Sequence, residues 1–284
     1  HTIINSVLEN KNGQLWLGTR GDGLILYDPA ENRILKQYRR DIDDPNSLSS
    51  NDIYDMVADS AGNMYIATYG GGINILKPET ENFINPNNDL FDYPMGQCNK
   101  VRTLMLDSAG ILWIGSTNGL IQMNTADYSF RYNYKETNGN QNISNSDIHC
   151  IYKDSEGSIW IGTFGAGLNK VIDNIWSDEP IEVITYDMRN GLPSDIVLSI
   201  CEDNKGTLWL TSENAITRFD KENKTFQNFN VFKGSSDMYF AESNALKLAT
   251  GSILFGYNNG ICAFNPDRIL HSKDVPNIEF SRFQ

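Results

Sequence analysis

Six side chains that could bind a ligand lie at comparable places, shortly after one recurring strand motif, and they differ from repeat to repeat. Three of them are aromatic, and two can donate hydrogen bonds through a guanidinium or an amide group. This mixture suits a sugar, which offers apolar C–H faces and hydroxyl groups. The alternative for each position is an ordinary loop residue. The candidates are Arg20, Tyr69, Asn118, Phe164, Glu213 and Tyr257.

Side chains suited to general acid–base catalysis are few and scattered. Apart from His1 and His271 near the ends, the only histidine is His149, and it lies in an apolar segment where we expect a core role. Two acids that occur once in the repeat pattern, Glu213 and Glu242, leave an enzyme open as an alternative. We assign no catalytic residue and expect no cofactor.

Metal and thiol chemistry has little support in the sequence. The acidic segment 41–46 lacks the glycine and the closing glutamate of an EF-hand calcium loop, so we expect a solvated loop. The four cysteines form no CxxC pair, which argues against structural zinc. Buried free thiols are expected. The alternative is one disulfide between Cys150 and Cys201, which fall on equivalent strands of successive repeats. We therefore predict no metal site.

Composition narrows the range of partners. The chain has 284 residues, of which 40% are hydrophobic and 11% aromatic, enough to bury a large core. Its formal net charge of −13 repels nucleic acid and anionic lipid, so we expect neither as a partner. No apolar run approaches the roughly 20 residues of a membrane helix. The first residue is His1, so we expect a piece of a longer protein, with any signal peptide or membrane anchor outside it.

One motif, apolar–aromatic–apolar–small, recurs from end to end. A fixed period of 20 to 50 residues is typical of propellers and other repeat folds. We predict one propeller domain over residues 1–275, followed by residues 276–284 as an outer strand or the start of a linker to a further domain. The central positions of the six copies are 16, 65, 113, 160, 209 and 254, which are 49, 48, 47, 49 and 45 residues apart, and the sixth copy lacks the aromatic residue there.

Each repeat is predicted to form four short antiparallel strands. The first is apolar and ends at an Asp-x-x-Gly turn such as residues 107–110, and the second carries the motif. A glycine-rich turn such as residues 70–72 follows, and the fourth strand carries spaced aromatic residues. Such sheets, repeated radially, make an all-β propeller whose inner strands are buried between blades. Trp16, Trp113, Trp160 and Trp209 should therefore pack between blades, and the repeated Asp should form turns.

Strand order also predicts a binding face. If each blade runs from the inner to the outer strand, the second-to-third-strand turns and the linkers between repeats open on the same face. The six candidate residues occupy these turns. Loops on a rigid scaffold can vary in sequence while the scaffold fixes their position. We therefore predict that a ligand binds on this face.

Taken together, these motifs resemble the two-component regulator propeller repeats. The resemblance is carried by the motif strands, by the Gly-x-Gly-Leu turns and by the linker of residues 44–53. It covers essentially the whole chain. Residues 191–195 with 201–203 resemble the penultimate blade of that family, residues 255–261 with 264–267 its final blade, and residues 276–280 the strand that leads into an immunoglobulin-like domain.

The resemblance implies the periplasmic sensor region of hybrid two-component histidine kinases of Bacteroidetes. Such a region is a non-catalytic propeller that recognises glycan-derived oligosaccharides and signals to a kinase outside this sequence. It implies an oligosaccharide ligand, no membrane contact by these residues and a homodimer of the full-length sensor. Because family propellers usually have seven blades, a seven-bladed ring that lacks one blade is the alternative to six blades. A propeller lyase or hydrolase and a pure protein-interaction scaffold are the alternative functions.

Overall fold

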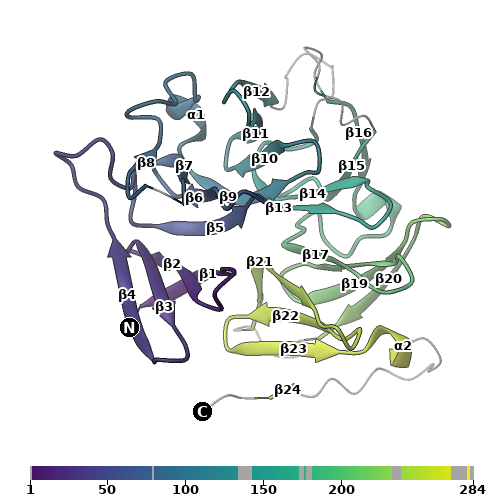
Figure 1. The fold of residues 1–284 in the computed structure, drawn as a ribbon. Coiled ribbons are helices and arrows are strands. Elements are labelled where there is room, and N and C mark those ends of the chain that lie inside the picture. Colours follow the sequence, from purple (N-terminus) through teal and green to yellow (C-terminus); the bar gives the residue numbers. More distant parts are fainter. Residues whose placement is uncertain are drawn as a thin grey trace. The chain divides into compact units, whose positions relative to one another are not determined.

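The computed structural model of the chain describes residues 2–78, 80–133, 143–172, 176, 181–231, 238–269 and 280–281. The chain divides into two compact units. Unit 1 comprises His1–Tyr134 and Ser146–Ile148, and unit 2 comprises Lys135–Asn145 and His149–Gln284. Six four-stranded antiparallel sheets account for most of the described secondary structure (Figure 1). We call each sheet a blade and number the blades along the chain.

The strands of blades 1 to 3 lie in unit 1, and within each blade they are hydrogen-bonded in chain order. Blade 1 consists of β1 (Ile3–Glu9), β2 (Leu15–Arg20), β3 (Leu24–Asp28) and β4 (Arg33–Tyr38). Blade 2 consists of β5 (Ile53–Ala58), β6 (Met64–Thr68), β7 (Gly72–Leu76) and the short β8 (Phe83–Ile84). One helical turn, α1 (Met95–Cys98), precedes blade 3, which consists of β9 (Val101–Leu106), β10 (Ile111–Ser116), β11 (Gly119–Asn124) and β12 (Phe130–Asn133).

Blades 4 to 6 repeat this order. Blade 4 consists of β13 (Ile148–Lys153), β14 (Ile159–Thr163), β15 (Leu168–Val171) and β16 (Val183–Tyr186), followed by the 3-10 turn η1 (Met188–Asn190). Blade 5 consists of β17 (Ser199–Glu202), β18 (Leu208–Thr211), β19 (Ala215–Asp220) and β20 (Thr225–Asn230). Blade 6 consists of β21 (Phe240–Lys247), β22 (Ile253–Tyr257), β23 (Gly260–Phe264) and β24 (Phe280–Ser281), with α2 (Pro266–Ile269) before its last strand.

The prediction of an all-β propeller with four-stranded blades is thus confirmed, and six blades are present. The helical elements α1, α2 and η1 are each a single turn. Among the described residues, no helix is long and apolar enough to cross a membrane. The fold therefore consists of hairpins and the loops that join them.

A hydrogen bond between the repeated Asp and the tryptophan six residues later holds the inner hairpin of blades 3, 4 and 5. In blade 5, Trp209 Nε1 donates to Asp203 Oδ2 at 2.9 Å. The other carboxylate oxygen, Asp203 Oδ1, accepts the main-chain N–H groups of Lys205 and Thr207. One side chain therefore closes the turn and satisfies the polar edge of a buried indole. The equivalent pairs are Trp113 with Asp107 at 3.2 Å and Trp160 with Asp154 at 2.8 Å.

Blades 2 and 6 show what this bond requires. In blade 2, Tyr65 takes the aromatic position, and its hydroxyl donates to Asp59 Oδ2 at 3.4 Å. In blade 6, Leu248 and Leu254 stand at the two positions, so the acid and the aromatic residue are absent together. The carboxylate thus accompanies an aromatic side chain that has a proton to donate.

Neighbouring blades within each unit bury the motif strands. In blade 2, Met64 and Ile66 pack toward blade 1, while Tyr65 and Ala67 pack toward blade 3. In unit 2, the ring of Trp160 meets Phe219 of blade 5 edge to face, with centroids 5.7 Å apart. This two-sided burial explains the consecutive apolar residues in the motif. Trp113, Trp160 and Trp209 are at most 1% exposed, as predicted.

Trp16 departs from that prediction because it is only half-buried. In its turn, Asn10 replaces the repeated Asp, and the Asn10 amide nitrogen donates to Gln14 Oε1 at 3.0 Å. An amide offers one acceptor oxygen where a carboxylate offers two, and that oxygen already accepts the main-chain N–H groups of Asn12 and Gln14. The bond that seals the other tryptophans is therefore missing in blade 1.

One face of blade 1 is also open. Ile4 and Val7 of β1 are 50% and 56% exposed, whereas their counterparts in blade 2, Ile53 and Met56, are 0% and 4% exposed. This side of β1 thus exposes apolar side chains that are buried in blade 2. The alternative of a seven-bladed ring that lacks one blade stays a prediction.

The cysteines are all buried free thiols, as expected, so the alternative Cys150–Cys201 disulfide is not formed. Burial raises the pKa of Cys150 to about 12. A thiol with this pKa stays protonated at neutral pH and is a poor nucleophile and metal ligand.

The Asp–Trp bond predicts a stability effect in blade 5. Asp203→Ala should lower the free energy of unfolding by about 3 kcal/mol, because the buried N–H groups of Thr207 and Trp209 and the part-buried N–H of Lys205 lose their carboxylate acceptor. Asp203→Asn should cost less, since an amide oxygen can still close the turn as Asn10 does in blade 1. Urea unfolding followed by tryptophan fluorescence measures both. Equal stability of Asp203→Ala and the unchanged protein would contradict this role.

Candidate functional site

The turn after the motif strand is clamped to the linker that enters the next blade. In blade 2, the N–H groups of Gly70 and Gly72 both donate to the Asn99 carbonyl, at 2.8 and 2.9 Å. Both glycines have φ values in the left-handed region, +101° and +70°. Two donors on one acceptor fix the residue just before the turn against the linker. The same clamp joins Gly21 and Gly23 to Asn51, and Gly165 and Gly167 to Asp195.

In unit 1, this clamp brings two of the predicted residues together through a third. Tyr69 stacks on Tyr54 of β5, with ring centroids 5.1 Å apart and planes inclined by 23°. Arg20 Nη2 donates to the Tyr54 hydroxyl at 3.5 Å. Lys100 Nζ lies 5.2 Å from the centroid of the Tyr69 ring, a cation–π distance. We call Arg20, Tyr54, Tyr69 and Lys100 the tyrosine cluster.

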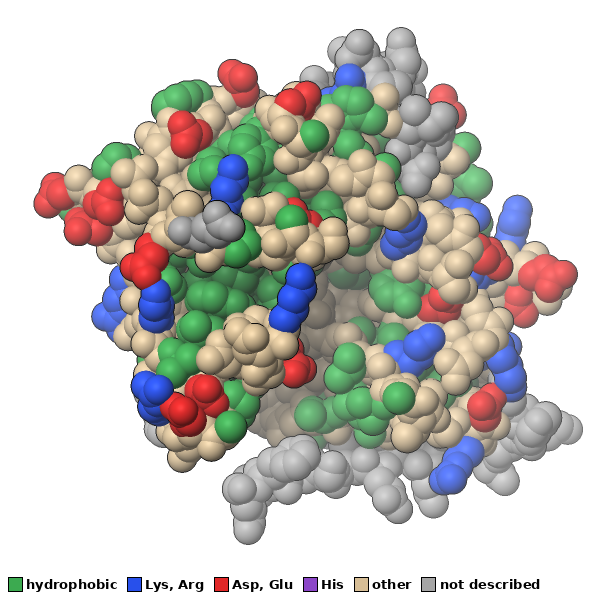
Figure 2. All heavy atoms as spheres, in the orientation of Figure 1, with side chains coloured by type: hydrophobic (Ala, Val, Ile, Leu, Met, Phe, Trp, Pro, Cys, Tyr) green, Lys and Arg blue, Asp and Glu red, His purple; other side chains and the backbone are tan. Residues whose placement is uncertain are grey.

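The tyrosine cluster is accessible and carries positive charge. Its cations, Arg20 and Lys100, are exposed, and its two tyrosines are half-buried. The face drawn in Figure 2 intersperses acidic and basic side chains, so the net charge of −13 does not form a continuous acidic surface there. An aromatic plane flanked by two cations can stack on the C–H face of a sugar and donate to its hydroxyl or carboxylate oxygens.

Two members of this cluster could not be identified from the turn pattern. Tyr54 comes from the inner strand β5, and Lys100 from the linker just before β9. The signal that could have found Lys100 is the bridge pairing of Tyr69 with Lys100, which recurs as Arg20 with Asp52 and Phe164 with Ile196. The residue before each clamped turn therefore faces a linker residue.

Asn118 stands apart from the cluster. It is exposed, and its main-chain carbonyl accepts hydrogen bonds from the Tyr132 hydroxyl at 2.5 Å and from Cys98 Sγ at 3.8 Å. No contact described for it joins Asn118 to Tyr69 or Arg20. Blade 3 also lacks the Gly-x-Gly turn. Asn118 thus serves a local turn.

In unit 2, Phe164 forms a second group of contacts. Its side chain is 49% exposed and stacks on His149, with centroids 5.4 Å apart and planes inclined by 18°. His149 is 2% exposed, in agreement with the predicted core position, and its Nδ1 lies 3.6 Å from Glu242 Oε1. The hydroxyl of Ser243 donates to the His149 carbonyl at 2.6 Å. We call His149, Phe164 and Glu242 the histidine cluster.

The histidine cluster does not have the geometry of a nucleophilic triad. A serine nucleophile must donate its proton to the imidazole. The Ser243 hydroxyl instead donates to the main-chain carbonyl of His149. The imidazole and the Glu242 carboxylate can still share a proton across 3.6 Å after a small movement.

The remaining two predicted residues, Glu213 and Tyr257, do not join the histidine cluster through any described contact. Glu213 is exposed, and its carbonyl accepts the N–H of Phe240 at 2.9 Å. Tyr257 is half-buried and packs on the core of blades 5 and 6. Each unit therefore brings together only part of the predicted set, and His1 and His271 lie outside the described residues.

Unit 2 also contains a buried charge cluster. It lies at the other ends of the strands from the histidine cluster. Lys221 Nζ is 2.9 Å from both Asp154 Oδ2 and Glu202 Oε1, and their side chains are 12%, 0% and 4% exposed. Burial by itself raises the pKa of Asp154, but the hydrogen bonds from Trp160 and Lys221 outweigh it and hold the pKa below 3.8. With its partners fixed, this cluster joins blades 4 and 5 and is not an acid–base pair poised for catalysis.

This charge cluster predicts a stability effect. Lys221→Met should lower the free energy of unfolding by about 3–5 kcal/mol, because two carboxylates stay buried without their cation. Lys205→Ala removes a surface cation paired with Asp267 and should cost less than about 1 kcal/mol. Urea unfolding of the two variants measures the contrast. Similar losses in both would contradict a buried structural role for Lys221.

The lowered pKa of Asp154 also predicts a pH dependence. Its stabilisation is fully present above the unfolded pKa of about 3.9 and is lost as the pH falls through the lower folded pKa. Unfolding free energies measured from pH 7 down to acid should therefore decline below about pH 4. The decline attributable to Asp154 should vanish in Asp154→Asn, and an unchanged decline would assign it to other carboxylates.

Comparison with known proteins gives a family match. The sequence profile described as two component regulator propeller matches residues 47–70, 96–118, 142–165 and 191–214. These segments run from the linker through the first two strands of blades 2 to 5. Each includes one of the predicted turn residues, Tyr69, Asn118, Phe164 or Glu213.

The relatives are longer proteins. Histidine kinase P4 of Formosa agariphila is 29% identical over 272 residues, which are 95% of this chain but 19% of that protein. The extracellular domain assigned to the hybrid two-component system BT3049 of B. thetaiotaomicron is 22% identical with a TM-score of 0.59, over 97% of this chain and 40% of that one. The chain thus spans a fifth to two fifths of these relatives.

An enzyme shares the fold as well. The virginiamycin B lyase of Staphylococcus aureus, solved with quinupristin as an inactive variant, is 14% identical with a TM-score of 0.65, over 94% of this chain and 82% of the lyase. At such identities, the structural likenesses establish the propeller fold alone. Function must be argued from the site.

Proposed function

Because four segments of the chain match the two component regulator propeller model, we propose that it is the extracytoplasmic sensor region of a hybrid two-component system. It binds an oligosaccharide without chemical turnover and passes the signal to a histidine kinase in the remainder of a longer protein. The kinase partner is supported by the likeness to a histidine kinase, and the location outside the cytoplasm by the likeness to an extracellular domain. The ligand rests on this chain's own residues.

The observation that carries the ligand assignment is the tyrosine cluster. The stacked pair of Tyr54 and Tyr69 gives an aromatic plane, and aromatic side chains at the centre of a site often supply much of the binding energy. Lys100 Nζ lies over the Tyr69 ring, and Arg20 Nη2 lies at the Tyr54 hydroxyl, so both N–H donors are within reach of a ligand on the pair. Because both flanking groups are cations, the cluster favours an oligosaccharide that carries carboxylates, such as a uronate, over a neutral one of the same length.

The clamp explains why such a site suits a sensor. The Tyr69 main chain is bonded to Asp52, and the following glycines are bonded to Asn99, so one turn contacts the linkers before β5 and before β9. A ligand on Tyr69 therefore contacts the segments that join blades 1, 2 and 3. Binding would stabilise one arrangement of these linkers, which is the differential affinity that a signal requires.

A test of this function uses calorimetric titration of the chain, and of the longer protein, with uronate-containing oligosaccharides and neutral ones of equal length. Tyr69→Ala should weaken the uronate oligosaccharide about tenfold, or about 1.4 kcal/mol. Lys100→Ala should weaken it and reduce the salt dependence of its affinity. Asn118→Ala, on a turn outside the cluster, is the matched control and should leave the affinity unchanged. Unchanged affinity in Tyr69→Ala and Lys100→Ala would remove the site from this cluster.

A second candidate function, a lyase or hydrolase propeller, is favoured by one observation, the approach of Glu242 to His149. A turnover assay on the oligosaccharides that bind separates the two functions. Product formation that is lost in His149→Gln would establish the enzyme. The third alternative, a scaffold that dimerises without a ligand, would give a dimer in light scattering and no heat in the titrations.

A further inference from the structure

A cavity of about 720 Å³ opens between blades 1 and 2 of unit 1. It lies among the first-to-second-strand turns and the third-to-fourth-strand turn of blade 2, at the opposite strand ends from the tyrosine cluster. Figure 2 shows it as a hollow with apolar walls. Its volume is within the range of small-molecule sites. Its apolar walls are formed by Leu8, Trp16 and Leu26 of blade 1 and by Met64, Leu76 and Pro78 of blade 2.

Two departures from the repeat create this cavity. The first is Asn10 in place of the repeated Asp, which leaves the Trp16 indole without the turn carboxylate that holds Trp113, Trp160 and Trp209. The second is the outer strand β8, which has two residues where β4 and β20 have six. A short outer strand leaves the outer part of blade 2 uncovered beside blade 1. The aromatic residue that is sealed in three other blades therefore lines an open space in this one.

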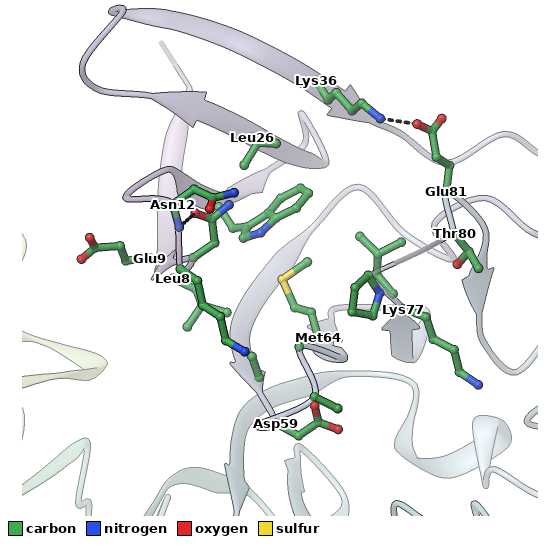
Figure 3. A pocket seen from close by; sticks show the side chains of 18 of the residues that line it. Leu8, Glu9, Asn12, Leu26, Lys36, Asp59, Met64, Lys77, Thr80 and Glu81 are labelled. Atoms are coloured by element: carbon green, nitrogen blue, oxygen red, sulfur yellow. Dashed lines mark hydrogen bonds and ion pairs between the residues drawn. The ribbon is translucent and has the colours of Figure 1, made fainter.

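Polar groups with balanced charge form the rim. Lys36 of β4 and Glu81 before β8 make an ion pair across the edge of the cavity, as Figure 3 shows. Asn12 and Asp59 lie on the facing turns. Among the lining residues that the structure describes, lysines and acids are equal in number, three of each. They are Lys11, Lys36 and Lys77, and Glu9, Asp59 and Glu81.

We propose that this cavity is a separate binding site for a neutral saccharide of about two pyranose rings. A sugar ring stacks its C–H face on the Trp16 indole, and its hydroxyl groups meet the amide of Asn12 and the rim carboxylates. An apolar floor with a mixed donor and acceptor rim fits a ligand that has one apolar face and polar edges, whereas a wholly apolar ligand would leave the rim unsatisfied. The described lining carries as many acids as lysines, so nothing in it favours an anion as the two cations of the tyrosine cluster do. This site goes beyond the proposed function. Ligand binding at the cavity and ligand binding at the tyrosine cluster are tested separately, so either proposal can be wrong while the other holds.

The test is a titration of the full chain with neutral disaccharides, namely cellobiose, maltose, lactose and mannobiose, at concentrations up to about 10 mM, where even a millimolar site fills. Tryptophan fluorescence is the readout, because Trp16 lines the cavity and is half-buried, whereas Trp113, Trp160 and Trp209 are at most 1% exposed. Trp176 is half-buried as well but belongs to unit 2, so the change in emission should disappear in Trp16→Ala. At least one disaccharide should change the emission with a saturable curve. Trp16→Ala should weaken its binding, measured by calorimetry, at least tenfold.

Two variants keep this test decisive. Ala61→Trp places a large side chain at the cavity from an exposed turn position and should abolish binding without disturbing the core, even if Trp16→Ala folds poorly. Tyr69→Ala, in the tyrosine cluster, should leave disaccharide affinity unchanged. The absence of binding by all four sugars, or equal affinity in the unchanged protein and Ala61→Trp, would overturn the proposal. Loss of binding in Tyr69→Ala alone would place the neutral sugar at the tyrosine cluster.

Discussion

The carboxylate that closes the inner hairpin of blades 3, 4 and 5 and accepts the indole N–H six residues later is the interaction on which these blades depend. A tryptophan can fill the space between two sheets only if its one polar group is satisfied there. Asp203 does this for Trp209 while its second oxygen holds the turn, so one charged side chain is fully used inside the protein. With the hairpin fixed at this end, the motif strand delivers its last residue at the opposite end in a constant place. There the glycine clamp ties it to the linker of the next blade.

Candidate sites occur where a blade departs from this scheme. The turn after the motif strand is free to vary because its position is set by the main-chain clamp, and Tyr69 uses this freedom to stack on Tyr54 beside two cations. In blade 1, the exchange of one carboxylate for the Asn10 amide releases Trp16 from its acceptor. The repeat thus explains the stability of the fold. Departures from it explain the few positions whose side chains remain available to bind a ligand. The buried Lys221 shows the opposite case, since its charge is fully used between blades 4 and 5.

The fold was predictable because every repeat carries its own strand and turn signals, and the period of the motif does not depend on long-range contacts. The repeated Asp was predicted only as a turn former. Its bond to the indole could have been recognised from the constant six-residue spacing and from blade 6, where Leu248 and Leu254 replace both partners. The site was predicted less completely. Arg20 and Tyr69 meet through Tyr54, which belongs to an inner strand, and Lys100 comes from a linker. These contacts depend on how the strands of two neighbouring blades are aligned, which the sequence around each residue does not show. One cause of the half-burial of Trp16, the exchange of the repeated Asp for Asn10, can be read from the local sequence, whereas the other, the short β8 of the neighbouring blade, cannot.

The central claim is that an oligosaccharide binds on the clamped turns and thereby acts on the linkers between blades. Amide hydrogen exchange with and without a saturating uronate oligosaccharide tests it directly. The N–H groups of Tyr69, Gly70 and Gly72 donate to carbonyl groups of the linkers, so the turn of residues 69–72 and the linkers around residues 51–54 and 99–101 should become ordered together. The account predicts slower exchange in these three segments together, while the hairpin of residues 199–211 in unit 2 stays unchanged. Slower exchange confined to residues 8–12 and 58–62, or no change at saturation, would contradict it.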